Sequence, residues 1–366
     1  MAPAGSAREH GILIGRLEPG PANSIADVPG VGVGHVTIVR DEPNLPAGRG
    51  VARTGVTAIA PGAPESLWRE PVPAGVAVLN GAGEMTGALQ VMELGYIETP
   101  IYLTSTMAVG RIYDGAISAA VAAEPAIGIE HVVIPVVAEC DDSWLNDPRV
   151  VQVEADDAGR ALELAAAGGE VPEGAVGAGA GMVTFGYKGG IGTASRVAEG
   201  GALVGVLLLS NFGSREDMRV DGVPVGPLLP GPATGPRAPA GSCIVVVATD
   251  APLAAADLTR LARRAGLGLA RSGSVAHNGS GEIFLAFSTG ARAPRDDPGA
   301  RAPLVSGDGL DPLFSAAVEA TEEAVLNSLW RAQRTVGREG IVAEALPHDA
   351  LLALLSENGR LDGPAA

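Results

Sequence analysis

The chain has 366 residues, of which 46% are hydrophobic, 18% charged and 3% aromatic, and its formal net charge is −17. This composition predicts a globular protein with a sizeable core and excludes a disordered chain. The acidic excess argues against nucleic-acid binding, which needs clustered cations to replace the counterions on phosphates.

The N-terminus, the cysteines and the histidines give no sign of a secreted, membrane or metal-binding protein. The first ten residues lack the apolar core of a signal peptide, and no run of about 18 apolar residues is present. Cys140 and Cys243 form no CxxC pair, which suits free thiols in a reducing compartment. The five histidines show no paired spacing typical of a metal site. We therefore expect a cytoplasmic protein that uses no metal or cofactor and binds neither membrane nor nucleic acid.

In the first half of the chain, short apolar runs alternate with glycine turns and helical patterns. Residues 1–20 are expected to form a polar arm. Apolar runs between turn residues predict buried strands at residues 31–36, 51–60, 75–80, 101–104 and 131–139. Helical spacing predicts helices over residues 105–123 and 156–167, and glycine-rich turns are expected at 80–87 and 177–182.

The second half alternates strands and helices. Strands are expected at residues 201–210, 242–249 and 282–287. Asp250 is expected to cap one helix, and Asp311 followed by Pro312 to open another. A short apolar helix at 351–355 closes the chain. Because many of the strands are apolar throughout, they are expected to be buried on both faces, which predicts a layered α/β protein.

The junction between Gly241 and Ser242 is the most informative feature of the sequence. Residues 222–241 contain six prolines and five glycines, which excludes a helix interior or a central strand and predicts a flexible connector. A glycine and then a hydroxyl at the head of a buried strand is the layout of a self-cleaving hydrolase. Cleavage there would give Ser242 a free α-amine beside its own hydroxyl. The alternative is a surface loop that enters an ordinary strand.

Lys188 is the only lysine among 25 lysine and arginine residues. Arginine is larger and planar and does not deprotonate, so a position that keeps lysine in such a sequence is expected to need a compact ammonium group. Chance is the alternative explanation.

Five segments together resemble the L-aminopeptidase/D-amidase/D-esterase and β-peptidyl aminopeptidase family (DmpA-like and BapA-like). The 6-aminohexanoate-oligomer hydrolases are more distant relatives. The segments are residues 144–147, 188–195, 220–226, 246–253 and 278–282. No single segment is specific, but their combination and order are, and the resemblance runs from residue 25 to residue 289.

The resemblance implies a four-layer α/β/β/α sandwich, in which helices flank two central sheets. This is the architecture of N-terminal-nucleophile hydrolases with a different connectivity. It further implies that one domain, residues 1–366, is made as a precursor that cleaves itself between Gly241 and Ser242. The products would be an α-chain of residues 1–241 and a β-chain of residues 242–366. Relatives also imply a homo-oligomer, a tetramer of αβ units.

Carried over residue by residue, the resemblance implies a catalytic set. Ser242 is the nucleophile, and its freed α-amine helps to move the proton. Ser280 and Glu282, two apart at a strand start and so on one face, orient or activate it. Asn211 corresponds to the oxyanion-hole amide, and Lys188 to a lysine that polarises the site or supports its hydrogen bonds.

The resemblance also implies a substrate site. Glu139 corresponds to a glutamate that binds the ammonium group of the substrate by charge-assisted hydrogen bonds. Trp144 either walls the pocket or belongs to the core. Asp141 departs from the family, whose members often carry tyrosine there. A carboxylate does not replace a phenol as a neutral donor, so either Asp141 joins the ammonium site or catalysis lacks this donor.

The sequence therefore predicts a self-processing serine aminopeptidase that forms an acyl-enzyme on Ser242 with short peptides, amides or esters bearing a free amine. β-Peptidyl or amide-oligomer specificity is an alternative, and the preference among L-, D- and β-amino acids stays open. Acyl transfer, as in ornithine acetyltransferases, and an uncleaved non-catalytic binding protein are alternatives of other classes. Cys243 could also drive an acyl shift, but we expect it on the far face of its strand.

Overall fold

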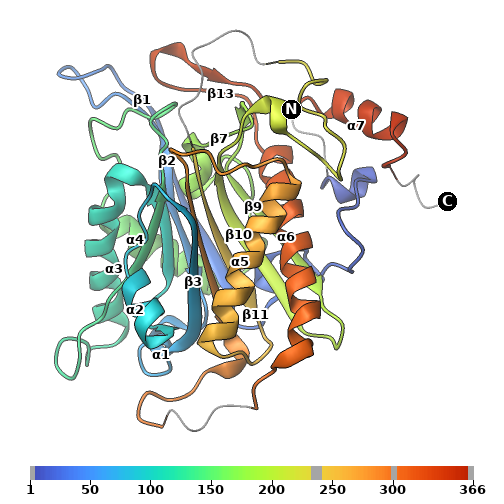
Figure 1. Cartoon of the computed structure of the whole chain (residues 1–366). Coiled ribbons are helices and arrows are strands. Elements are labelled where there is room, and N and C mark those ends of the chain that lie inside the picture. Colours follow the sequence, from blue (N-terminus) through green and yellow to red (C-terminus); the bar gives the residue numbers. More distant parts are fainter. Residues whose placement is uncertain (1–4, 232–240, 298–302, 362–366) are drawn as a thin grey trace.

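The computed structural model describes residues 5–231, 241–297 and 303–361. Two sheets pack face to face, and a pair of helices covers the outer face of each (Figure 1). The layers therefore run helices, small sheet, large sheet, helices. The predicted four-layer α/β/β/α sandwich is confirmed.

The smaller of the two sheets has four strands in the order β1-β2-β5-β6. Strands β5 and β6 are parallel, and the other pairs are antiparallel. The strands are β1 (Gly32–Asp41), β2 (Val51–Ala60), β5 (Ile101–Ser105) and β6 (Val136–Cys140). Helices α3 (Val109–Ala123) and α4 (Asp156–Ala167) pack on the outer face.

The larger sheet has six strands in the order β4-β3-β12-β11-β10-β9. Only β11 and β12 are parallel to each other. The strands are β3 (Val72–Gly81), β4 (Tyr96–Ile97), β9 (Ile191–Val197), β10 (Leu203–Asn211), β11 (Ser242–Thr249) and β12 (Gly281–Ser288). Helices α5 (Ala255–Arg271) and α6 (Asp311–Trp330) cover this sheet.

Short elements complete the described part of the chain. They are the helices α1 (Pro64–Leu67), α2 (Ala88–Leu94) and α7 (His348–Glu357), and the two-stranded pairs β7 (Val183–Thr184) with β8 (Tyr187–Lys188) and β13 (Thr335–Val336) with β14 (Val342–Ala343). Among the described residues, no helix combines the length and the apolar character needed to cross a bilayer.

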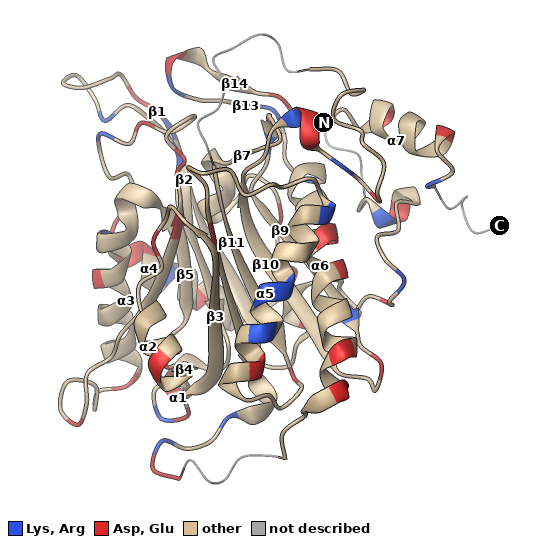
Figure 2. Cartoon of the chain, viewed as in Figure 1, with Lys and Arg blue, Asp and Glu red and all other residues tan. Residues whose placement is uncertain are grey.

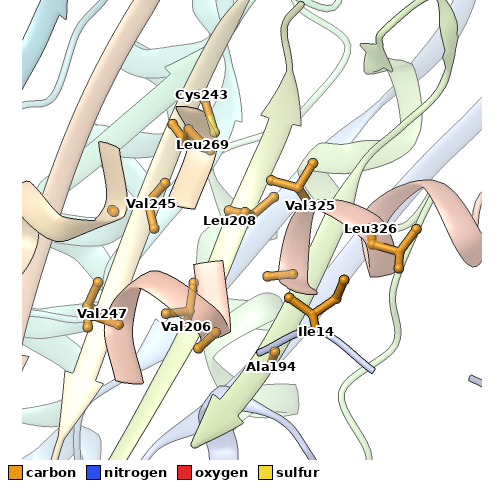
Figure 3. Close-up of a cluster of buried hydrophobic side chains, with 14 of the residues drawn as sticks. Ile14, Ala194, Val206, Leu208, Cys243, Val245, Val247, Leu269, Val325 and Leu326 are labelled. Atoms are coloured by element: carbon orange, nitrogen blue, oxygen red, sulfur yellow. The ribbon is translucent and has the colours of Figure 1, made fainter. Parts of the chain in front are cut away.

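Strand β11 contributes to two apolar layers because its side chains alternate between faces. Ile244 and Val246 lie in the core between the sheets. Cys243, Val245 and Val247 lie in the core under the helices (Figure 3). Charged residues are concentrated on the helices and loops around this core, and the central strands carry few of them (Figure 2).

The N-terminal arm is not the polar extension that the sequence suggested. Ile12 and Ile14 are buried in the core formed with α6. Arg196 of β9 is fully buried, and its guanidinium donates to the Ile14 carbonyl (2.6 Å) and to Glu323 of α6 (2.5 Å). Arg8 of the arm also donates to Glu323 (2.9 Å). A buried ion pair with both partners hydrogen-bonded therefore ties the arm to α6.

Three local expectations were wrong. The strand expected over residues 131–139 begins only at Val136, because Pro135 has no N–H for a sheet ladder. Asp250 does not cap α5; its carboxylate accepts the N–H of Leu203 (2.8 Å), and Ala254 is the N-cap. Asp311 is the first residue of α6 and not its cap.

The expected connector divides into two parts. Residues 222–231 form a coil that is packed on the molecule, with Val223, Val225 and Leu229 buried in the core. Residues 232–240 lie outside the described residues, and the description resumes at Gly241.

Candidate active site

Ser242 is the first residue of β11 and is 5% exposed. It pairs with Asn211, the last residue of β10. A Cβ atom on residue 241 would overlap the carbonyl oxygen of Asn211, so the close approach of the two strands requires the glycine at 241. The predicted junction therefore lies where a buried hydroxyl enters the centre of the larger sheet.

The Ser242 side chain faces the space between the sheets. It shares its strand face with Ile244, and it lies within hydrogen-bonding reach of the Cys140 thiol at the end of β6. Burial raises the pKa of the Cys140 thiol, and the Ser242 hydroxyl partly opposes that rise. Burial also raises the pKa of Cys243, which lies on the opposite face as expected. Both thiols are therefore protonated and poor nucleophiles.

Ser280 and Glu282 lie beside Ser242 on the neighbouring strand. The parallel register pairs Cys243 with Glu282, which brings Ser242 level with Gly281. The Ser280 hydroxyl donates to Oε1 of Glu282. Burial raises the pKa of Glu282, and the Ser280 hydroxyl lowers it. Oε2 of Glu282 is buried and accepts no hydrogen bond from any described residue, so this oxygen is available to a further donor.

Asn211 is held by both ends of its amide. Its Oδ1 accepts the N–H of Val183 (2.9 Å), and its Nδ2 donates to the carbonyl oxygen of Asp141 (2.9 Å). These bonds fix the amide beside Ser242 and leave one Nδ2 hydrogen without an acceptor among the described residues. The amide is therefore held in one orientation with one N–H able to donate to a further acceptor.

Lys188 does not contact Ser242 through any of its hydrogen bonds. Its ammonium group donates to three carbonyl oxygens, those of Gly179, Met182 and Gly189, at 2.7 to 2.9 Å. It is fully buried, and burial lowers its pKa to about 7. The same peptide unit whose carbonyl it binds at Met182 donates its N–H, that of Val183, to Asn211. Lys188 therefore supports the Asn211 amide through one peptide unit.

Glu139 of β6 is 3% exposed, and two donors hold its carboxylate. Oε1 accepts the N–H of Glu84 (2.9 Å), and Oε2 accepts the hydroxyl of Thr106. Burial raises the pKa of Glu139, and these two hydrogen bonds lower it. The carboxylates of Asp141 and Glu84 raise it further. A bound cation would relieve this unfavourable surplus of negative charge.

Asp141 and Trp144 lie in the loop that follows β6. The Asp141 carboxylate accepts the N–H of Ser143 (2.9 Å), while its main-chain carbonyl binds Asn211. Trp144 is half-buried against a small apolar cluster that includes Leu145 and Val183. The observed contacts of Trp144 are those of a packing residue.

Sequence reasoning missed two polar residues that organise this site. Nδ2 of Asn80 donates to the carbonyls of His277 (2.9 Å) and Ser280 (2.5 Å), and so holds the turn before β12. Asp142 is fully buried and accepts the hydroxyl of Ser105 (2.9 Å), and burial raises its pKa to about 6. The sequence pointed only to a glycine-rich turn after Asn80, and this turn did not indicate which residues Asn80 would contact.

A groove of about 500 Å³ opens beside these residues. Its wall combines the turn after β3, helix α2 and two apolar side chains from elsewhere, Ile134 and Ile283. Among the described residues, no group of three or more His, Cys, Asp or Glu is arranged to hold a metal ion.

Comparison with known proteins identifies the family. The sequence profile of peptidase family S58 matches residues 23–343. The chain belongs to peptidase family S58. The beta-peptidyl aminopeptidase BapA of Sphingosinicella microcystinivorans is 44% identical to this S58 peptidase, over 94% of this chain and 90% of that protein.

Solved structures agree with the assignment of this S58 peptidase. A Burkholderia sp. beta-aminopeptidase superposes with a TM-score of 0.86 at 41% identity, covering 97% of this chain and 99% of that one. The L-aminopeptidase D-Ala-esterase/amidase of Ochrobactrum anthropi, described as a prototype serine aminopeptidase with a variant Ntn hydrolase fold, has a TM-score of 0.87 at 39% identity over 98% and 99%. The predictions of this family, of an aminopeptidase and of an N-terminal-nucleophile hydrolase are confirmed.

Proposed function

We propose that this S58 peptidase cleaves its own chain between Gly241 and Ser242 and then uses Ser242 as the nucleophile of an aminopeptidase. The observation that carries the proposal is the position of Ser242, buried in register with Asn211 and level with the residue between Ser280 and Glu282. The backbone of Ser242 thus lies between Asn211 of β10 and the start of β12, where the Ser280 hydroxyl donates to the Glu282 carboxylate. The family is one of peptidases, which favours hydrolysis over acyl transfer or a non-catalytic role.

The proposed self-cleavage is an acyl shift followed by hydrolysis. Oγ of Ser242 attacks the carbonyl carbon of Gly241, the bond from that carbon to the Ser242 nitrogen breaks, and the nitrogen takes up the hydroxyl proton. Water then hydrolyses the ester. Residues 1–241 gain a carboxylate, and residues 242–366 gain a free α-amine. Enforced proximity of the hydroxyl and the carbonyl supplies much of the rate.

The proposed aminopeptidase reaction uses the same hydroxyl. The α-amine of Ser242, with an ordinary pKa of about 8, accepts the hydroxyl proton as Oγ attacks the substrate carbonyl and then protonates the leaving amine. Asn211 stabilises the oxyanion. The unpaired Oε2 of Glu282 fits an acceptor for the new ammonium group. Water completes the cycle by releasing the acyl group.

The proposed substrates are short peptides, amides or esters with a free amine, and Glu139 receives that amine. The enclosed carboxylate and the carboxylates near it support this role. The names of the relatives point to both β-peptides and L- or D-amino-acid derivatives. We further propose a cytoplasmic enzyme, supported by two free cysteines, and a tetramer of αβ units. Large exposed apolar side chains such as Ile129 (84%) and Val132 (74%) support an oligomer.

Denaturing mass spectrometry of freshly purified protein tests the proposal. We expect two fragments, of residues 1–241 and 242–366, from the parent protein and a single chain of 36.6 kDa from Ser242→Ala. Cleaved protein should then hydrolyse p-nitroanilides of L-Ala, D-Ala or β-Ala. An intact parent chain after long incubation, or cleavage at another bond, would contradict the assignment of Ser242.

A further inference from the structure

The turn between β3 and α2 spans the two ends of the proposed site. At one end, Asn80 holds the turn that carries Ser280. At the other end, the N–H of Glu84 holds the carboxylate of Glu139. The residues between them lie over Gly281, because a Cβ atom on residue 281 would lie 2.6 Å from the carbonyl oxygen of Ala82. This turn therefore connects the Ser280 side of the proposed site, where the acyl group would form, to the Glu139 side, where the substrate amine would bind.

Gly83 lies in this turn close to both the Glu139 carboxylate and Gly281. A Cβ atom added to Gly83 would lie 3.1 Å from Oε1 of Glu139, 3.6 Å from Cα of Gly281 and 3.8 Å from the side chain of Ile283. Gly83 is exposed, so the space in front of it is open to solvent. Its φ angle is not in the left-handed region, so the backbone does not itself require glycine. What the missing side chain provides is room next to the Glu139 carboxylate.

The groove begins at this open space. Gly83 lines it together with the polar residues Glu84, Thr86 and Gln90 and with six apolar side chains. The apolar ones are Val78, Met85, Ala88, Leu89, Ile134 and Ile283. Its volume of about 500 Å³ is much larger than an ammonium group needs. A substrate whose amine meets Glu139 can therefore direct its side chain along this apolar surface.

We propose that Gly83 is a specificity-determining position, which keeps the approach to Glu139 open, and that the groove takes an apolar side chain of the N-terminal residue of the substrate. This inference rests on the proposed function, because it assumes that the substrate amine meets Glu139. It adds the chemical class of the residue that the enzyme removes. Self-cleavage is not expected to depend on Gly83, because that step needs no ammonium group.

The test compares Gly83→Ala with Gly159→Ala. Gly159 lies in α4 and does not line the groove, and a Cβ atom there would meet no atom within 4 Å. Both variants should cleave themselves completely. For leucine p-nitroanilide, we expect Gly83→Ala to raise KM about ten-fold with kcat within about two-fold, as one misplaced methyl group does in a pocket. Gly159→Ala should match the parent enzyme.

Inhibition by simple amines tests the groove in the parent enzyme without any acyl chemistry. Isoamylamine should inhibit at least about ten-fold more tightly than ethylamine, because three further carbons enter an apolar surface. Equal inhibition by the two amines would overturn the apolar subsite even if Gly83→Ala failed to fold. An unchanged KM in self-cleaved Gly83→Ala, or an equal rise in Gly159→Ala, would overturn the role of Gly83. A parent protein that stays uncut or inactive would instead refute the proposed function, and this inference with it.

Discussion

Replacement of the only lysine by a neutral side chain tests how the Asn211 amide is held. In Lys188→Met, three carbonyls lose an N–H donor. Those of Gly179 and Met182 each keep one main-chain donor, but that of Gly189 keeps none among the described residues. The loss of all donors at one buried carbonyl and of one donor at two others should lower the unfolding free energy by about 2–4 kcal/mol. Part of this cost is offset because the variant no longer buries an ammonium group.

The functional effect of Lys188→Met should pass through the Met182–Val183 peptide. With its carbonyl held by one donor instead of two, the N–H that orients Asn211 is less well placed, and kcat should fall about ten- to a hundred-fold with a smaller change in KM. Urea unfolding is measured in an uncleaved Ser242→Ala background, so that parent and variant are both single chains. Kinetics are measured with Ser242 present.

A matched variant and a pH series sharpen this test. Lys188→Arg keeps the charge but places a planar fork where three carbonyls surround one nitrogen, so it should not rescue kcat. Burial lowers the pKa of Lys188 to about 7 from 10.5. The unfolded chain then binds more protons between these values, so stability should rise with pH across that window in the parent and not in Lys188→Met. Parental stability and kcat in Lys188→Met would refute the reasoning.

Three further predictions concern single side chains. Glu139→Gln removes the charge that we propose to meet the substrate amine and should raise KM at least about ten-fold without slowing self-cleavage, which mass spectrometry and kinetics on one preparation can compare; slowed self-cleavage would argue for a structural role. Gly241→Ala places a methyl group on the carbonyl of Asn211, so a gel time course should show slow or absent self-cleavage, and parental rates would contradict the required close approach. Burial raises the pKa of Asp142 from 3.8 to about 6, so its favourable contribution is present below pH 4 and lost as pH rises through 6. Asp142→Asn should therefore gain up to about 3 kcal/mol over the parent between pH 4 and 6 in urea unfolding, and a flat difference would refute the assignment.

The sequence predicted the strands best where apolar runs are long and bounded by turn residues. Residues 51–60 and 242–249 have the predicted boundaries. Strand β9 was missed because Ile191–Val197 contains glycine, alanine, serine and threonine and is buried by its neighbours. The arm was misread because Ile12 and Ile14 are too few to form a pattern, although both are buried.

The candidate site could be proposed from the sequence as a set of residues but not as a network. Ser242, Asn211 and Glu282 occur at strand ends, where sequence patterns are readable and the strand order brings them together. Lys188 donates to three main-chain carbonyls. Every residue has such a carbonyl, so the sequence could not indicate which ones the lysine would bind. The proximity of Gly83 to Glu139 likewise depends on how a turn crosses a distant strand.

The strand order of the larger sheet has a consequence for the separated pieces. Strands β11 and β12 lie in the middle of that sheet, with β3 on one side and β10 on the other. Cleavage before Ser242 would leave β11 and β12, which belong to the shorter fragment, hydrogen-bonded on both sides to strands of the longer fragment. Neither fragment alone could then form the complete sheet. The two fragments would therefore separate only on unfolding, and the new N-terminus at Ser242 would stay fixed in the middle of the sheet.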